Sequence, residues 1–356
     1  MPYPEHLEAF VQLGAFFNQF YESDTIKNNE WSSKLEHVLQ QAEIQNKWYT
    51  QENLLHAICQ WGHLLNEQNL EQWRSNYTIK SKRSPKIVAI IMAGNIPLVG
   101  FHDFLCVLLS GNKVLAKLSS NDKLLLPFIK DFLVEQDTTL EGKVSFTEEK
   151  LTDFDAVIAT GSNNTSRYFD YYFGKYPNII RRNRNSVAVL TGEERKEQLE
   201  GLGEDIFRYF GLGCRSVSKL FVPQDYDFDA FFQAIYSWKH VLDHHKYVNN
   251  YDYNKAVYLM SEINILDNGF LILKEDAGFG SPIATLFFEY YTSLEGLKER
   301  LCKEAESIQC VVAEGFMANE VPFGQTQAPM LSDYADGLDT MQFLIELDQF
   351  TSPLNQ

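Results

Sequence analysis

The 356-residue sequence lacks the long apolar runs and the paired cysteines that mark membrane-spanning and secreted proteins. No stretch of about 18 uncharged apolar residues occurs, so the sequence predicts no membrane-spanning helix. Its N-terminal residues have neither the basic segment nor the apolar core of a signal peptide. The five cysteines are odd in number and widely spaced, which does not fit a disulfide framework. Together these absences predict a cytoplasmic protein whose thiols stay reduced.

Positive charge is also scarce. The chain has 31 Lys and Arg residues against 48 Asp and Glu residues, a formal net charge of −17. A polyanion repels a phosphate backbone, so we expect no nucleic-acid partner. A small phosphorylated ligand remains compatible with this charge, because a glycine-bearing turn at a helix N-terminus binds phosphate locally.

Several motifs of known chemistry are missing. The stretch GLGEDI begins like a dinucleotide-binding fingerprint at Gly201, but Ile206 stands where the third glycine is required and no strand precedes it. Neither a phosphate-binding P-loop nor a G-x-S-x-G hydrolase elbow occurs. The stretch HVLDHHKY has metal-ligating residue types, but adjacent histidines diverge on a helix and no second cluster completes a coordination shell. We therefore predict no metal site.

The remaining pattern is that of an α/β protein. Residues 5–78 predict helices, because apolar residues recur there at three- and four-residue intervals. After the charged stretch YTIKSKRSPK, helices alternate with expected strands in KIVAIIMAGNIPL, NKVLAKLSS, FDAVIATGS and NSVAVLTG. This alternation predicts a parallel sheet covered on both faces, with turns at Gly94, Ser119 and Gly161 gathered where the strands end and ligands bind. From about residue 191, a second region carries Cys214, aromatic-rich helices and later strands.

Six motifs in order carry a family resemblance. They are MAGNIPLVGFHDFLCVLLSGNKVLAKLSS, ATGS, VAVLTG, GLGCRSVSKLFVP, KEDAGFGSPIATLFF and VPFGQ, and the resemblance that they carry covers about residues 85 to 330. The chain resembles the aldehyde dehydrogenase superfamily, and within it the acyl-CoA reductases typified by the fatty-acid reductase subunit of bacterial bioluminescence. The resemblance implies two three-layer α/β domains with Rossmann-type parallel sheets, and a homo-oligomer. The expected organisation is a helical segment 1–84 on the cofactor domain, that domain at 85–190 joined by 325–356, and a catalytic domain at 191–324.

The resemblance implies two catalytic residues. Cys214 aligns with the nucleophile, and Arg215, the oriented backbone and a helix start are each expected to lower the pKa of its thiol. The alternative is a thiol that only fills space. Asn95 aligns with the side-chain donor to the oxyanion, because an amide NH2 donates without titrating. Its alternative role is that of a turn asparagine.

The expected cofactor is NADP(H) in preference to NAD(H). Lys117 aligns with a lysine that holds the adenosine ribose, although a solvated surface lysine is the alternative. Ser119 and Ser120 replace a proline and an acidic residue of many NAD-preferring relatives, so no carboxylate repels a 2′-phosphate. The other implied contacts are Thr160, Gly161 and Ser162 with the pyrophosphate, Glu275 with the nicotinamide ribose, and Phe323 near the nicotinamide.

One difference from the superfamily indicates the reaction. Hydrolytic aldehyde dehydrogenases carry a water-activating glutamate in L-E-L-G-G, where AVLTG here places Val189. An acyl group on Cys214 would then leave by transfer to a thiol or by hydride reduction. The sequence thus predicts NADPH-dependent reduction of an acyl thioester, from coenzyme A or an acyl carrier, to the aldehyde. Two alternatives stay open: oxidation of a free aldehyde with Glu193 or Glu194 as base, and an inactive cofactor-binding subunit.

Overall fold

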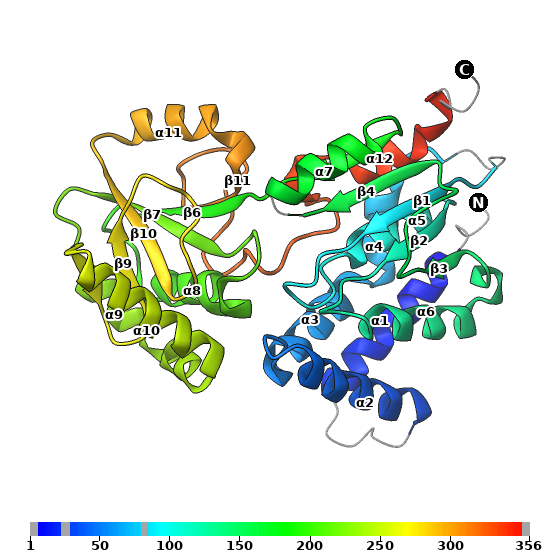
Figure 1. Ribbon diagram of the computed structural model, residues 1–356, viewed down its shortest axis with the longest axis horizontal. Coiled ribbons are helices and arrows are strands. Elements are labelled where there is room, and N and C mark those ends of the chain that lie inside the picture. Colours follow the sequence, from blue (N-terminus) through cyan, green and yellow to red (C-terminus); the bar gives the residue numbers. More distant parts are fainter. Residues whose placement is uncertain (1–5, 23–28, 80–83, 162, 351–356) are drawn as a thin grey trace. The chain divides into compact units, whose positions relative to one another are not determined.

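The structure is a computed structural model that describes residues 6–22, 29–79, 84–161 and 163–350. The chain divides into two units, which Figure 1 shows as ribbons. The first unit comprises Met1–Arg182 and Met330–Gln356, and the second comprises Asn183–Pro329. Of the helices in the described ranges, none is long and apolar enough to cross a membrane.

The first unit is built on a five-stranded parallel sheet in the order β3-β2-β1-β4-β5. Its strands are short apolar runs such as IVAII in β1, as expected where both faces of a sheet are covered. Strand addition changes direction at β1, which pairs with β2 on one side and β4 on the other. In such sheets, this switch point forms the ligand crevice beyond the carboxyl ends of the strands. The elements are β1 Ile87–Ile91, α5 Phe101–Leu109, β2 Lys113–Lys117, α6 Leu125–Gln136, β3 Val144–Phe146, β4 Ala156–Thr160, α7 Asn163–Phe173 and β5 Asn178–Arg181.

Four N-terminal helices share one hydrophobic core with the sheet and with α5 and α6. Ring contacts join them: Phe16 stacks on Phe132 with 4.9 Å between ring centroids, and Trp61 meets Phe101 edge-on at 4.6 Å. On the other face of the sheet, Phe169 of α7 packs against a smaller cluster. The unit therefore has helices on both faces of its sheet. The N-terminal helices are α1 Leu7–Glu22, α2 Glu30–Gln45, α3 Gln51–Leu64 and α4 Glu67–Ser75.

The C-terminal segment returns to the first unit and is held by a buried ion pair. Arg181, at the end of β5, and Asp103, on α5, are both about 95% buried, and Arg181 Nη2 donates to Asp103 Oδ1 at 2.8 Å. The same nitrogen donates to Thr340 Oγ1 at 3.0 Å, at the start of α12 (Thr340–Ile345). Because a buried charge is stable only when it is paired and hydrogen-bonded, this cluster joins the returning segment to the sheet.

The second unit has a six-stranded sheet in the order β11-β6-β7-β10-β9-β8, parallel except for the antiparallel edge strand β8. The predicted α/β architecture with two largely parallel sheets is therefore confirmed. Helix α11 covers one face, where Leu297 and Leu301 belong to the same buried hydrophobic cluster as Phe221. The elements are β6 Asn185–Val189, α8 Lys196–Phe207, β7 Val217–Pro223, α9 Phe228–Ala234, α10 His245–Met260, β8 Ile265–Asp267, β9 Ile272–Glu275, β10 Thr285–Tyr291, α11 Leu294–Lys303 and β11 Ile308–Val312.

One strand lies in a different sheet from the one expected. The segment NSVAVLTG forms β6, but it pairs with β7 and β11 of the second unit and not with the strands before it. The chain thus enters the second unit at Asn183, ahead of this strand, whereas we expected the change after residue 190. Alternation of strands and helices continues across the boundary, so the pattern cannot tell which sheet a strand joins.

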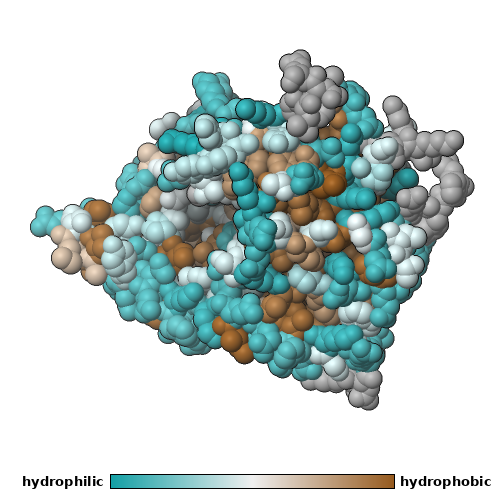
Figure 2. Space-filling view, turned by 45° about the vertical axis from the view of Figure 1, so that its right-hand side comes forward, coloured by the Kyte–Doolittle hydropathy of each residue, from teal (hydrophilic) through white to brown (hydrophobic). Residues whose placement is uncertain are grey.

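Polar side chains predominate on the face seen in Figure 2, and apolar residues appear there as patches between them. Such a distribution is ordinary for a folded protein, whose surface always retains apolar atoms.

Candidate active site

Cys214 lies in a turn that leads into β7, and its side chain is exposed. The turn is held by two hydrogen bonds: Ser216 N donates to Gly213 O at 3.0 Å, and Ser186 Oγ donates to Cys214 O at 2.9 Å. Ser186 is fully buried in β6, so it ties the cysteine backbone to the sheet. The expected helix start after Cys214 is wrong, because the run Val217–Pro223 pairs as a strand with β6 and β10.

The backbone just before this turn is strained. The 3-10 segment η2 (Arg208–Gly211) contains three successive left-handed residues, Tyr209, Phe210 and Gly211, with φ of 55°, 56° and 73°. Only glycine adopts this region without steric cost, and each bulky residue there costs about 1–3 kcal/mol. The two aromatic side chains are buried, and their packing holds the conformation. Strain of this kind concentrates at functional sites. Its position just before Cys214 distinguishes this thiol from the chain's other exposed thiol, Cys302.

Two loops of the second unit are bonded to the Cys214 turn and to the start of β7. Arg215 Nε donates to Thr326 O at 2.5 Å, which brings in the loop that carries Phe323. Ser218 Oγ donates to Phe279 O at 2.7 Å, which brings in the loop that follows Glu275 at the end of β9. Three segments that the sequence singled out therefore meet around the start of β7.

Asn95 lies in the loop between β1 and α5 and is exposed. The N-terminal helices hold this loop through their α2–α3 connection. Tyr49, fully buried, donates its hydroxyl to Ile96 O at 2.9 Å, and Asn46 Nδ2 lies 3.4 Å from Gly94 O. Residues on both sides of Asn95 are thus bonded to a rigid helical layer. No motif in the sequence indicates this anchoring role for residues 46–49.

Next to this loop, burial raises the pKa of the Asp122 carboxyl from 3.8 to about 6. The ionised form is therefore less favourable in the folded than in the unfolded chain, by roughly 3 kcal/mol. The stability associated with the neutral carboxyl is fully present below pH 3.8 and is lost as the pH rises through about 6.

We therefore expect Asp122→Asn to raise the free energy of unfolding of the first unit at pH 8 by roughly 1–3 kcal/mol. At pH 4 the same substitution gives no gain, because the wild-type carboxyl is largely neutral there. Urea unfolding of both proteins at the two pH values measures the difference. An equal effect at pH 4 and pH 8 would contradict this prediction.

The expected cofactor residues of the first unit follow three neighbouring parallel strands. Lys117 ends β2, Thr160 ends β4, and the Asn95 loop follows β1 between them. Lys117 is half-buried, and its Nζ donates to Glu149 O at 3.0 Å. Ser119 accepts a hydrogen bond from Asn121 N at 3.2 Å. Because parallel strands end at one edge of a sheet, the structure brings these residues to the switch point around β1.

Two glycines shape this edge as a narrow cradle. A Cβ atom on Gly94 would lie 2.5 Å from Ser119 Oγ, and one on Gly161 would lie 2.9 Å from the Phe169 ring and 3.1 Å from Thr165. Only glycine permits these close approaches. Helix α7 begins at Asn163 directly after the Gly161 turn, which suits a bound phosphate group. The residues present thus fit a dinucleotide. Ser162, also expected on the pyrophosphate, lies outside the described residues.

The two expected cofactor residues of the second unit differ in exposure. Glu275 is exposed at the end of β9. In the sheet it pairs with Phe288 of β10, and Phe288 pairs with Leu220 of β7. Phe323 is half-buried in the loop after Val321. The backbone of this loop packs closely on α8, so Phe323 belongs to a fixed segment.

Glu194 is poorly placed as a water-activating base. Its Oε1 accepts hydrogen bonds from Thr191 N and Oγ1, and its Oε2 accepts one from Gly192 N at 3.1 Å. This turn follows the carboxyl end of β6, whereas Ser186 holds Cys214 at the amino end of the same strand. At about 3.3 Å per residue, the two ends are separated by roughly 15 Å. Glu193 shares this turn.

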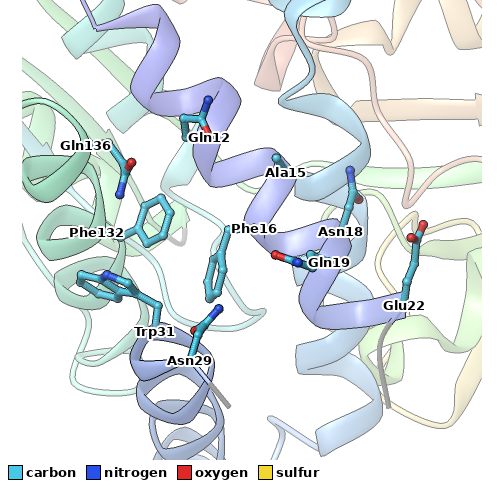
Figure 3. A pocket seen from close by; sticks show the side chains of 10 residues that line it. All are labelled: Gln12, Ala15, Phe16, Asn18, Gln19, Glu22, Asn29, Trp31, Phe132 and Gln136. Carbon is cyan, nitrogen blue, oxygen red and sulfur yellow. The ribbon is translucent and has the colours of Figure 1, made fainter. Parts of the chain in front are cut away.

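A cavity of about 640 Å³ in the first unit lies between α1, the start of α2 and α6 (Figure 3). It is lined by Gln12, Ala15, Phe16, Asn18, Gln19, Glu22, Asn29, Trp31, Phe132 and Gln136, none of which is an expected site residue.

The stretch considered for metal binding has a structural role in the second unit. His244 caps α10, where its ring accepts a hydrogen bond from Tyr247 N at 3.4 Å. Over the described ranges, no group of three or more potential ligands is arranged to hold a metal ion.

The sequence model of the acyl-CoA reductase (LuxC) family matches residues 7–237. The chain belongs to this family. The matched range includes the N-terminal helices, the Asn95 loop, the edge with Lys117 and Thr160, and the Cys214 turn. Membership in this family makes the protein an oxidoreductase. No match was found among curated proteins.

Solved aldehyde dehydrogenases share the fold. An indole-3-acetaldehyde dehydrogenase solved with NAD+ gives a TM-score of 0.59 at 12% identity, over 86% of this chain and 71% of that chain. A mutant aldehyde dehydrogenase from Bacillus cereus gives 0.58 at 14% identity, over 88% and 72%. An NADP-dependent enzyme from E. coli gives 0.53 at 13% identity, over 86% and 76%. The resemblance to the aldehyde dehydrogenase superfamily is thus confirmed at the level of the fold.

Proposed function

We propose that this acyl-CoA reductase family member reduces an acyl thioester to the aldehyde, with Cys214 carrying the acyl group and NADPH as reductant. The observation that carries the proposal is the exposed thiol in a turn that directly follows a strained backbone segment and is held by buried Ser186, inside the range that the family matches. A nicotinamide cofactor is supported by the dinucleotide-like edge of the first unit and by the NAD+ and NADP named for the similar structures.

In the first step, the Cys214 thiolate attacks the carbonyl carbon of the substrate thioester. A new carbon–sulfur bond forms first and moves an electron pair onto the carbonyl oxygen. The donor's carbon–sulfur bond then breaks as the carbonyl re-forms, and the donor leaves as a thiolate. One thioester replaces another, so this exchange needs little driving force. The negative charge that develops on the carbonyl oxygen is stabilised by the Asn95 amide and the Cys214 backbone N–H.

In the second step, the S-acyl cysteine is reduced. A reduced nicotinamide, when bound, supplies a hydride to the acyl carbon. Lys117, Thr160 and Gly161 are proposed to hold the dinucleotide, with Glu275 and Phe323 at its nicotinamide end. Collapse of the thiohemiacetal then frees the aldehyde and returns the Cys214 thiolate. The occupied carboxylate of Glu194 supports reduction over hydrolysis.

The test is incubation of the purified protein with NADPH and acyl-CoAs of increasing chain length, or with an acyl-carrier thioester. Loss of NADPH absorbance with stoichiometric aldehyde, captured by a hydrazine, is the expected result. A second arm supplies a free aldehyde and NADP+ without any acceptor thiol. Oxidation to the acid in that arm, without reduction in the first, would replace this proposal by the hydrolytic alternative.

Ser120 provides a test of cofactor preference, because it is exposed just beyond β2 and Lys117. We expect Ser120→Glu to lower kcat/KM for NADPH about 10- to 100-fold while leaving that for NADH within about threefold, since a carboxylate here repels a 2′-phosphate. Ser120→Gln, of equal size and no charge, is the control. If both substitutions change the two cofactors equally, Ser120 does not face the 2′ position.

A further inference from the structure

Helix α8 contains the stretch GLGED, which is unrelated to the dinucleotide fingerprint that it resembles. Its glycines serve close packing. A Cβ on Gly201 would lie 3.1 Å from Gly324 N, and one on Gly203 would lie 2.7 Å from the Trp238 ring. Gly324 itself has a φ of 79° and approaches Gly201 as closely from the other side. The pair Gly201 and Gly324 therefore lets α8 and the loop of residues 322–327 touch backbone to backbone.

Asp205, one helical turn beyond Gly201, holds the same loop. Its side chain is fully buried, and its two oxygens accept three hydrogen bonds. Gly324 N donates to Oδ2 at 2.7 Å, while Thr326 N and Thr326 Oγ1 donate to Oδ1 at 2.9 and 2.8 Å. Burial raises the pKa of Asp205, and these bonds act in the opposite direction. A carboxylate is the side chain that can accept on both oxygens at once.

The loop of residues 322–327, which Asp205 holds, is itself hydrogen-bonded to the Cys214 turn. Thr326 O accepts from Arg215 Nε at 2.5 Å, and Gln327 Nε2 lies 3.4 Å from Ser216 Oγ. Arg215 and Ser216 are the two residues that follow Cys214. A chain of bonds thus runs from Asp205 through Thr326 to Arg215, entirely within the second unit.

We infer that Asp205 is a positioning residue, which sets the conformation of the Cys214 turn through Thr326 and Arg215. Asp205 has no contact with the reacting atoms in this assignment. This inference rests on the proposed function for its catalytic meaning, but its structural claim concerns the thiol alone and can be tested without turnover.

Asp205→Asn is the main variant. Asparagine is isosteric, but its NH2 group would face a backbone N–H, so at least one of the three bonds is lost. We expect kcat for acyl-thioester reduction to fall about 10- to 100-fold, because small displacements of a reacting group have effects of this size. Thr326→Val removes the hydroxyl, which donates to Asp205 Oδ1 and accepts from Gln327 Nε2 at 3.3 Å, and it leaves both backbone bonds to Asp205 in place. It is expected to give a smaller loss, while Thr326→Ser keeps the hydroxyl and should retain activity.

The matched control is Asp267→Asn. Asp267 also accepts several hydrogen bonds, from Tyr251 Oη at 2.8 and 2.9 Å and from Gly269 N at 2.8 Å, and it pairs with Lys255. It lies on the edge strand β8, three strands from β7 in the sheet order. Because neighbouring strands are about 4.8 Å apart, Asp267 lies roughly 14 Å from β7. A merely structural role for Asp205 predicts similar losses of thermal stability in both variants and nothing else.

The decisive readout is the rate of iodoacetamide labelling of Cys214 relative to Cys302 in the same molecule, measured by peptide mass spectrometry from pH 6 to 10. In Asp205→Asn we expect this ratio to change at least about threefold, with a displaced pH profile, and to stay constant in Asp267→Asn. An unchanged ratio in folded Asp205→Asn would overturn the inference. If that variant does not fold, Thr326→Val decides in the same way. Failure of the proposed function is distinct: wild-type protein would then not turn over acyl thioesters, whatever the labelling ratio does.

Discussion

Replacing Cys214 by alanine is expected to lower kcat for acyl-thioester reduction by at least about 10³-fold, because the sulfur proposed to carry the acyl group is removed. Cys214→Ser should fall nearly as far, since a serine hydroxyl is far less ionised than a thiol at neutral pH. Stopped reactions with an acyl donor and no cofactor should show one added acyl mass on the peptide that contains residue 214. Neither the Cys214→Ala nor the Cys214→Ser protein should show that added mass.

Cys302 offers the matched control for this experiment. It is the other exposed cysteine of the chain and lies on α11, outside the left-handed segment of residues 209–211. Cys302→Ala is expected to keep full activity and full acylation. Should Cys214→Ala retain a tenth or more of the wild-type rate, or should Cys302→Ala lose activity as severely, the acyl group is not carried on Cys214.

Much of the fold could be predicted because the sequence pattern is local. Strands β1, β2 and β4 are apolar runs that end in turns, and the first four helices have regular apolar spacing. The short strands β3 and β5, VSF and NIIR, are too brief or too polar to show a pattern. Helix α10 escaped prediction because its sequence, HKYVNNYDYNKAVYLM, distributes apolar and polar residues around the whole helix and so forms no distinct apolar face.

The candidate site could be predicted only where a motif carries it. Asn95 and Cys214 stand in stretches of sequence that resemble a family, and their neighbours in the chain are informative. Asp205 could not be found in this way, because its partner Thr326 is 121 positions away and only the folded chain joins them. Tyr49 is similar: its hydroxyl meets Ile96 across 47 positions, and in the sequence it looks like any core tyrosine. Residues that position a site are recognised by contacts in space.

Asn95→Ala is expected to lower kcat about 10²- to 10³-fold, the usual effect of removing one oxyanion donor. The KM for the thioester should change little, because the donor acts on charge that develops in the transition state. Asn95→Asp should be at least as damaging, since it replaces an N–H donor by a charged acceptor of the same shape. Rates at saturating substrate separate kcat from KM.

A structural effect of Asn95→Ala can be excluded in the same samples. The loop of Asn95 is held from outside, by the buried Tyr49 hydroxyl on Ile96 O and by Asn46 near Gly94 O, so loss of the amide should leave the loop in place. Iodoacetamide displaces iodide at a saturated carbon and forms no oxyanion, so its reaction with Cys214 does not need an oxyanion donor. Labelling of Cys214 should therefore remain at the wild-type rate while turnover falls. A parallel loss of labelling and turnover would mean that Asn95 acts on the thiol, and would remove it from the role of oxyanion donor.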